Sequence, residues 1–263
     1  VLFRSSSINL RRMRMTVSFF AALARVALTA SLGAQAPAAT YRSSGEIEQT
    51  LGARARATPV PEMMAASVGR GDKFMINVVR RTKAQGAIAH DVGSEVHSVI
   101  DGSATLVTGG TIIRPAAGSG AVATIQGGER RRVSRGDIVM VPPQTPHWYT
   151  DFEGAFTYLE IRFDVGAPNG GPAVWLSPSE TARVLTERGS ATPAPLMFTA
   201  PVASGDKWQA NVVRRTKPQG GGPHELGTEV HHILDGAGTF VTGGRMVRQG
   251  NLNVIEGGES RRV

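Results

Sequence analysis

Cysteine is absent from this chain of 263 residues, and aromatic residues make up only 6% of it. The absence of cysteine excludes disulfides, thiolate metal sites and a cysteine nucleophile, and it leaves the redox compartment open. The chain also has no P-loop, no G-x-G-x-x-G after a strand and no G-x-S-x-G, so nucleotide and serine-hydrolase chemistry lack support. Glycine and proline are plentiful, with 32 and 15 residues, and favour the many turns of an all-β protein.

The formal net charge of +8 comes largely from the first 36 residues, which hold five arginines and no acid. Without them the balance is only +3. Most remaining basic residues form short pairs that we expect between strands, as at Arg80-Arg81, Arg131-Arg132 and Arg214-Arg215. Solvated strand ends explain such pairs, so we predict no nucleic-acid partner.

The N-terminal stretch has the plan of a secretory signal peptide. From Met13 or Met15, the candidate start, a basic beginning leads to an apolar middle and a small-residue end. Arg25 within the apolar part opposes membrane insertion, and the run is too short for a stable transmembrane helix. We predict a signal peptide over 1–36, a periplasmic or secreted protein and no stable membrane anchor after cleavage; a disordered tail is the alternative.

A long internal repeat divides the rest of the chain. GDKFMINVVRRTKAQG at 71–86 matches GDKWQANVVRRTKPQG at 205–220 in 12 of 16 positions. The offset of 134 residues is too long for a solenoid unit, so we interpret the repeat as a duplicated domain. The predicted domains are a complete one over 37–170 and a second over 171–263, which stops before the counterparts of Gly136, Pro142 and His147.

Each repeat is expected to begin with a short helix and continue as strands. Helices are predicted over 43–56, capped by Ser44, and over 177–189, where Ser177 and Glu180 fit a capping box. The strands predicted in the first repeat are 73–81, 95–100, 104–108, 111–114, 121–126, 137–142, 147–150 and 155–163. About eight strands without an interior helix favour a sandwich or closed barrel.

Histidine and glutamate recur at fixed spacing in both repeats. HDVGSEVH, ending at His97, matches HELGTEVH, ending at His231. Residues two apart in a strand share a face, so Glu95 should project with His97, and Glu229 with His231. Carboxylate and imidazole groups that converge are suitable ligands for divalent transition metals.

These motifs resemble those of the cupin superfamily, in a two-domain (bicupin) arrangement. The usual first motif, G-x5-H-x-H-x3,4-E-x6-G, is matched in its second half by His90, Glu95 and Gly102, and in the second repeat by His224, Glu229 and Gly236. The second motif, G-x5-P-x-G-x2-H-x3-N, is matched by Gly136, Pro142 and His147. Gln144 replaces its glycine and Asp151 its asparagine. The resemblance covers residues from about 40 to the end.

The resemblance implies tandem jelly-roll-like antiparallel β-barrels with a divalent metal (Fe, Mn, Zn, Ni or Cu) inside the first. Its ligands would be His90, Glu95 and His147. A usual first histidine is missing, because Ile88 and Gly222 occupy its place. His97 is a candidate replacement, and a hydrogen-bonding role for it remains open. His224, Glu229 and His231 would form a second, incomplete site.

Two functions stay open at this point. One is an exported metal-dependent enzyme acting on a small molecule, of dioxygenase, decarboxylase, isomerase or lyase type. The other is a non-catalytic module that binds a sugar or another small ligand. An open coordination position favours the enzyme and a closed one favours the module. The two repeats are expected to pack as a pseudo-dimer, or to form homo-oligomers through open strand edges.

Overall fold

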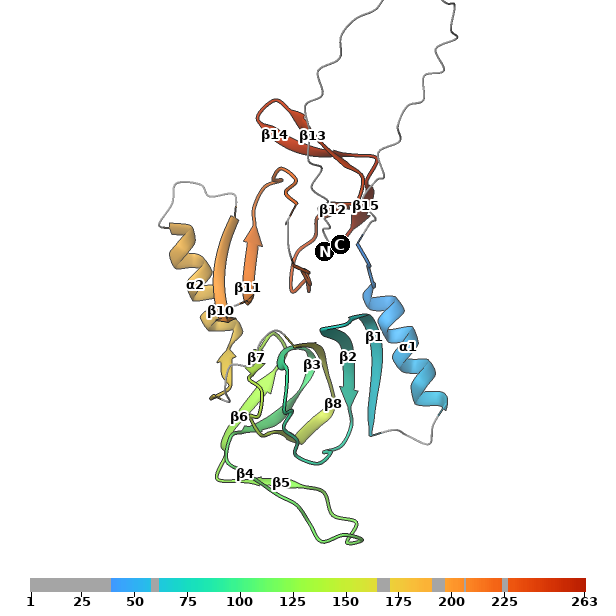
Figure 1. The fold of residues 1–263 in the computed structure, drawn as a ribbon, viewed down its shortest axis with the longest axis vertical. Helices are drawn as coiled ribbons and strands as arrows, with labels where there is room; N and C mark the ends of the chain where they lie inside the picture. The colour runs from blue at the N-terminus through green and yellow to red at the C-terminus, as the bar shows by residue number, and fades with distance from the viewer. Residues whose placement is uncertain (1–38, 58–61, 165–170, 191–196, 206, 224–226) are drawn as a thin grey trace, which may run out of the picture. The chain divides into compact units, whose positions relative to one another are not determined.

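The computed structural model describes residues 39–57, 62–164, 171–190, 197–205, 207–223 and 227–263 (Figure 1). The chain divides into two units. One is Tyr41–Pro218, and the other combines Val1–Thr40 with Gln219–Val263. The predicted signal peptide and the stretch around His224 lie outside the described residues. Among the helices described, none has the length and apolar character needed to span a membrane.

The protein is all-β with antiparallel sheets, and a short helix precedes each repeat, as predicted. The elements of the first repeat are α1 (Ser44–Ala57), β1 (Met63–Gly71), β2 (Phe74–Arg81), β3 (Ser94–Thr108), β4 (Thr111–Ile113), β5 (Thr124–Gln126), β6 (Glu129–Ser134), β7 (Ile138–Val141) and β8 (His147–Phe163). Those that follow are β9 (Val174–Leu176), α2 (Pro178–Ser190), β10 (Met197–Gly205), β11 (Trp208–Arg215), β12 (Thr239–Thr242), β13 (Arg245–Gln249), β14 (Leu252–Glu256) and β15 (Glu259–Arg262).

Two long strands, β3 and β8, form the frame of the first repeat. They pair antiparallel along their whole length, from Ser94 opposite Phe163 to Thr108 opposite His147. The sheet order is β1-β2-β8-β3-β7-β9, and β6 pairs with the far half of β3. The sequence predicted each long strand as two shorter ones, and the structure joins them.

A bend in β3 lets this sheet roll around one core. The register between β3 and β8 shifts three times between Val99 and Thr105. Gly102 lies within these shifts, with a φ of 75°, and a Cβ there would be 2.1 Å from the carbonyl oxygen of Ala155. Only glycine fits such a position without displacing backbone. Side chains from both halves of β3 therefore share a core that includes Val99, Leu106, Tyr149, Phe156 and Tyr158.

The outer face of the same sheet is covered by the beginning of the second repeat. Val96, Ile138 and Met140 form a second apolar cluster with Leu185 of α2 and with Ala200 and Val212 of β10 and β11. The Trp208 ring lies 5.1 Å from the ring of Phe163. Residues 171–218 thus belong to the unit of the first repeat, while the domain boundary after residue 170, which follows the repeat, stays a prediction.

The second repeat departs from its predicted strands at the motif itself. β12 pairs with β15, and β13 with β14, as β3 pairs with β6 and β4 with β5 in the first repeat. The prediction of a strand over the motif was wrong, because 229–238 lies outside any strand. In the first repeat this part of β3 is held by β7 and β8, whereas 229–238 pairs with no strand among the described residues. Backbone groups without a neighbouring strand form no ladder.

The helix starts are set by capping boxes. The Ser177 side chain accepts a hydrogen bond from the Glu180 N–H, and Glu180 accepts one from the Ser177 N–H in return, as predicted. In the first helix Ser43, not Ser44, is the cap, because its hydroxyl and N–H exchange the same two bonds with Glu46. The capping box needs a glutamate three residues after the cap, and Ser43 has that spacing.

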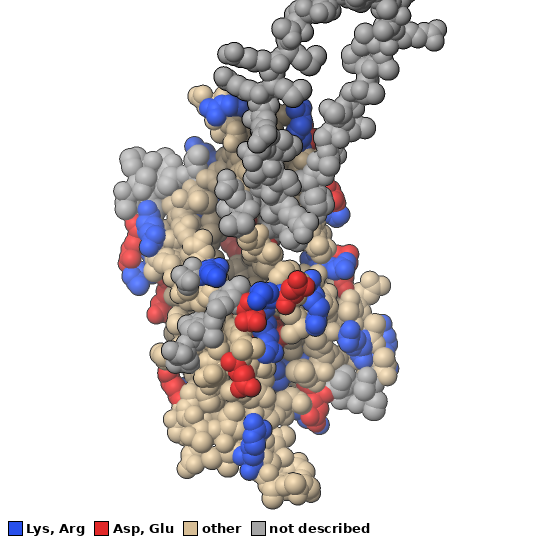
Figure 2. Space-filling view, in the orientation of Figure 1, with Lys and Arg blue, Asp and Glu red and all other residues tan. Residues whose placement is uncertain are grey.

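Charged side chains on the surface lie close to opposite charges. Figure 2 shows basic and acidic side chains interspersed on the face drawn. Arg130 pairs with Asp151 at 2.7 Å, and Arg132 with Glu153 at 2.8 Å. The expectation that the arginine pairs lie between strands was wrong. Arg80-Arg81 lies in β2, Arg131-Arg132 in β6 and Arg214-Arg215 in β11. The mixed charges are typical of a solvated surface.

Candidate metal centre

Backbone pairing holds the His90 loop against the start of β8. Ile88 and His147 form an antiparallel bridge, with N–H to O distances of 3.1 and 2.8 Å. One turn further, the Gln144 N–H donates to the carbonyl oxygen of His90 at 2.7 Å. Gln144 replaces the glycine of the motif and has a φ of 61°, a region that side chains adopt at a cost. That strained turn places His90 and His147 side by side.

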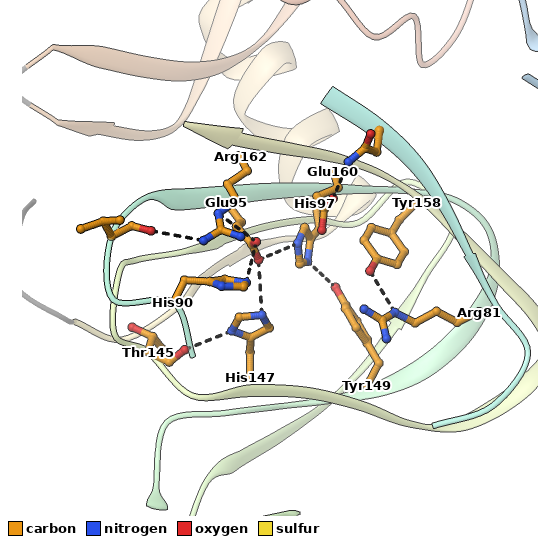
Figure 3. Close-up of polar contacts among 12 residues, drawn as sticks. Arg81, His90, Glu95, His97, Thr145, His147, Tyr149, Tyr158, Glu160 and Arg162 are labelled. Atoms are coloured by element: carbon orange, nitrogen blue, oxygen red, sulfur yellow. Dashed lines mark hydrogen bonds and ion pairs between the residues drawn. The ribbon is translucent and has the colours of Figure 1, made fainter. Parts of the chain in front are cut away.

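Three imidazoles converge on one buried carboxylate (Figure 3). The Glu95 side chain is 3% exposed. The His90 Nε2 lies 3.0 Å from its Oε1, and the Nε2 atoms of His97 and His147 lie 3.2 and 3.3 Å from its Oε2. Ligands bound to one divalent ion with bonds of about 2.1 Å lie about 3.0 to 3.4 Å from each other. The separations match those of ligands around an ion.

The carboxylate of Glu95 is strongly held in its charged form. Burial by itself would raise the pKa of Glu95, but the imidazoles of His147, His90 and His97, when their Nε2 atoms carry protons, outweigh burial and hold that pKa well below its usual range. The Arg162 guanidinium adds a positive charge, with its Nε 4.0 Å from Oε1. A charged carboxylate is the form that binds a metal ion.

The hydrogen bonds of the imidazoles fit metal ligation. The His147 Nδ1 lies 3.1 Å from the carbonyl oxygen of Thr145, which can only accept, so Nδ1 carries the proton. In the neutral ring the Nε2 of His147 is then a bare lone pair facing a carboxylate oxygen. His97 has a buried Nε2 without any hydrogen-bond partner. A lone pair aimed at a carboxylate repels it unless a cation lies between them, so the Nε2 of His147 fits a divalent metal, and the Nε2 of His97 makes no hydrogen bond that would compete with one.

The structure separates the four predicted ligands into two groups that share Glu95. In the first, one ligand atom each from His90, Glu95 and His147 lies within 4.8 Å of the others. In the second, Glu95 and His97 gather with Glu160 at the same limit. The residues of strand 155–163 were interpreted separately. Alternation puts Tyr158, Glu160 and Arg162 on one face, and the sequence favours ordinary packing and a surface ion pair there. In the structure Arg162 faces Glu95, its neighbour across the strands.

Deeper in the same interior lies a polar cluster that the sequence did not predict. Tyr149 bonds the His97 Nδ1 at 2.8 Å, and Arg81 donates from Nε to the Tyr158 hydroxyl at 3.0 Å. The Arg81 guanidinium also lies 5.9 Å from the Tyr149 ring centre and 5.8 Å from that of Tyr158. Burial raises the pKa of both tyrosines, so both are neutral phenols. The arginine pair of β2 was visible in the sequence, but nothing there indicated that Arg81 turns inward while Arg80 pairs with Glu48.

The second repeat offers only part of such a site. The His231 Nε2 lies 3.2 Å from the Glu229 Oε2, with side chains 40% and 36% exposed. His224 lies outside the described residues. Alternation along a strand would turn His232 away from the face of Glu229 and His231. This segment forms no strand, so the expectation does not apply; His232 is partly buried, and burial lowers its pKa.

Comparison with known proteins gives structural likeness alone. No family model and no curated protein matches the sequence. Solved structures that resemble part of the chain include KdgF from Halomonas sp., with 17% identity, 40% of this chain and 83% of that one covered, and a TM-score of 0.31. A cupin superfamily protein from Desulfitobacterium hafniense has 14% identity, 39% and 78% coverage, and a TM-score of 0.30.

A third similar structure is the cupin domain of Cnp3 from Schizosaccharomyces pombe, with 10% identity. It covers 40% of this chain and 66% of that one, at a TM-score of 0.31. Likeness at this level does not by itself establish a family or an activity for this chain. The motif and the geometry around Glu95 therefore have to carry any functional conclusion.

Proposed function

We propose that this chain is a bicupin-type metalloprotein whose first repeat binds one divalent transition metal through His90, Glu95 and His147. The observation that carries the proposal is the convergence of imidazole Nε2 atoms on the buried Glu95 carboxylate at 3.0 to 3.3 Å. Two histidines and one carboxylate that occupy one side of a metal ion leave its other coordination positions open for a substrate. Fe, Mn, Zn, Ni and Cu are all candidates for the metal, since the donors suit each of them.

We infer that the protein is a metal-dependent enzyme acting on a small molecule, of dioxygenase, decarboxylase, isomerase or lyase type. A bound metal would supply Lewis acidity or oxygen activation. The chain's own residues give two reasons for preferring catalysis to plain binding. Among the described residues, the first group offers three candidate ligands. His90 and Arg162, at 23% and 31% side-chain exposure, leave it within reach of solvent and substrate.

Export, a small-molecule partner and pseudo-dimeric or homo-oligomeric assembly are part of the same proposal. The signal-like segment at residues 13–36 supports a periplasmic or secreted location. The apolar packing of β10 and β11 on the first repeat supports close association of the two repeats.

Metal binding by variants of the full chain tests the proposal. We expect His147→Ala and His90→Ala each to lower the affinity for Zn²⁺ or Mn²⁺ at the first position by more than about 100-fold, because each removes a ligand and outer groups alone cost 10–100-fold. Glu153→Gln is the matched control, an exposed carboxylate on β8 that faces Ser103 and Arg132. Titration of metal-stripped protein, with elemental analysis after dialysis, provides the measurement. Unchanged binding by His147→Ala would contradict the site.

A further inference from the structure

The Nε2 atom of His97 is the most conspicuous unsatisfied group in the described interior. His97 is 1% exposed, and its Nδ1 is already engaged by the Tyr149 hydroxyl. Its Nε2 lies 3.2 Å from the Glu95 Oε2, yet the alignment does not make a hydrogen bond, and the atom has no hydrogen-bond partner. A buried donor or acceptor left in this way is costly unless something else binds it.

Glu160 lies opposite His97 on the neighbouring strand. The two are paired residues of β8 and β3, so their side chains share the inward face. One carboxylate oxygen of Glu160, one of Glu95 and one ring nitrogen of His97 all lie within 4.8 Å of one another. Asn77 of β2 steadies Glu160 by donating from Nδ2 to Oε2 at 3.1 Å. The unsatisfied nitrogen therefore lies within a cluster of carboxylate oxygens.

The charges of this cluster are those of a cation site. Two carboxylates held this close repel each other, and the Nε2 atom of His97 beside them makes no hydrogen bond. A divalent ion would relieve the repulsion and bind the unsatisfied nitrogen. One imidazole nitrogen with two carboxylates is a donor set that Mn²⁺, Fe²⁺ and Zn²⁺ accept. His97 does not belong with His90 and His147 in the first group, so an ion bound by His97 would be a separate one.

We propose that His97, Glu160 and Glu95 form a second divalent-cation position, joined to the first by the Glu95 carboxylate. This inference rests on the proposed function, because Glu95 serves both positions. The paired centre holds two ions in neighbouring places, an arrangement suited to oxygen-rich substrates that contact both metals. Tyr149 is a positioning residue in this centre, because its hydroxyl fixes the ring of His97.

Stoichiometry of Mn²⁺ in the full chain tests the second position. We expect about two equivalents for the unaltered protein at saturation and one for Glu160→Gln, which keeps the size and hydrogen bond of the side chain. Electron paramagnetic resonance adds a second readout. Two ions bridged by one carboxylate give a spin-coupled spectrum, and Glu160→Gln should convert it to the six-line spectrum of an isolated Mn²⁺. Glu153→Gln is the control, and it should retain both equivalents.

The outcomes separate this inference from the proposed function. One equivalent in the unaltered protein, lost in His147→Ala and unchanged in Glu160→Gln, would overturn the second position while leaving the first intact. The absence of any bound Mn²⁺ would overturn both. If His97→Gln lowers the affinity of a single equivalent and Glu160→Gln does not, His97 is a fourth ligand of the first ion and the inference is wrong. Circular dichroism checks that each variant is folded.

Discussion

The stretches 94–108 and 228–242 are identical at 8 of 15 positions and yet differ greatly in structure. The first forms the continuous strand β3, with Glu95 and His97 buried at 2% and 1% exposure. The second keeps only the four residues of β12 as a strand, its His231 is exposed and its Glu229 is half-buried. β3 has β7 on one side and β8 on the other along its motif, whereas no described strand pairs with 229–238 of the second stretch. The motif contains the candidate ligands, but in the first repeat the neighbouring strands bury them and bring them together.

The strongest test of this difference replaces the glycine that follows the motif in each repeat. Gly102→Ala should lower the free energy of unfolding by roughly 3 kcal/mol, since it adds left-handed backbone strain to a clash with the Ala155 carbonyl. At Gly236 nothing lies within 4 Å of the position that an added Cβ would take, so only the conformational cost of about 1 kcal/mol remains.

Urea unfolding followed by fluorescence measures this effect, because Trp148, Trp175 and Trp208 all belong to the unit Tyr41–Pro218. We expect Gly102→Ala to shift the fluorescence transition and Gly236→Ala to leave it in place. Equal shifts for the two variants would show that the motif bend matters equally in both repeats and would contradict the comparison.

A smaller effect should appear at high pH, and it belongs to the first repeat alone. Burial raises the pKa of Tyr158 in the folded protein above its unfolded value of about 10. The unfolded state therefore loses its proton first. The stability associated with Tyr158 is complete below pH 10 and falls as pH rises, by up to about 1.4 kcal/mol per pH unit for one tyrosine.

Urea midpoints measured between about pH 8 and 11 would show this dependence. Tyr158→Phe should make the decline above pH 10 shallower, since phenylalanine has no proton to lose, although the loss of the Arg81 contact lowers stability at every pH. An equally steep decline in the variant would mean that Tyr158 is not the group responsible.

The smallest change is expected from the second repeat's own motif. Glu229→Gln and His231→Gln should leave Zn²⁺ or Mn²⁺ stoichiometry unchanged after dialysis, because two exposed groups alone make a weak site. Glu95→Gln is the matched change in the first repeat, and it should remove the bound metal. If Glu229→Gln removed a full equivalent, the second repeat would hold metal without the strands that frame the first.

The sequence predicted helices and most strands of the first repeat, because caps and β-rich runs are local signals. It did not predict β1, whose run MMAASVGRG has little β-branched character, or the charged strand β6. It divided β3 at Gly102, since a glycine there indicates a turn until the partner strand is known. Both the divided strand and the missed strands are fixed by pairing with strands far away in sequence, which local patterns do not reveal.

The candidate site was predicted as far as the motifs reached. His90, Glu95 and His147 lie close together, as the resemblance implied, and their binding of a metal stays a prediction. Glu160 could not be assigned to His97, because that contact depends on the register between β3 and β8. Likewise, the inward turn of Arg81 depends on which face of β2 meets the core. A sequence shows which residues share a face, but not which face another strand will cover.

The pairing of β3 with β8 also sets the order in which the centre can appear during folding. Residues far apart in sequence must meet before that ladder forms. Closing such a long loop is slow, because the chain loses conformational entropy before it gains stabilising contacts. His90 precedes β3 and Glu95 lies near its start, whereas His147 is the first residue of β8. The candidate ligands His90, Glu95 and His147 therefore come together only when the ladder is complete. We expect bound metal to slow unfolding while leaving the folding rate nearly unchanged.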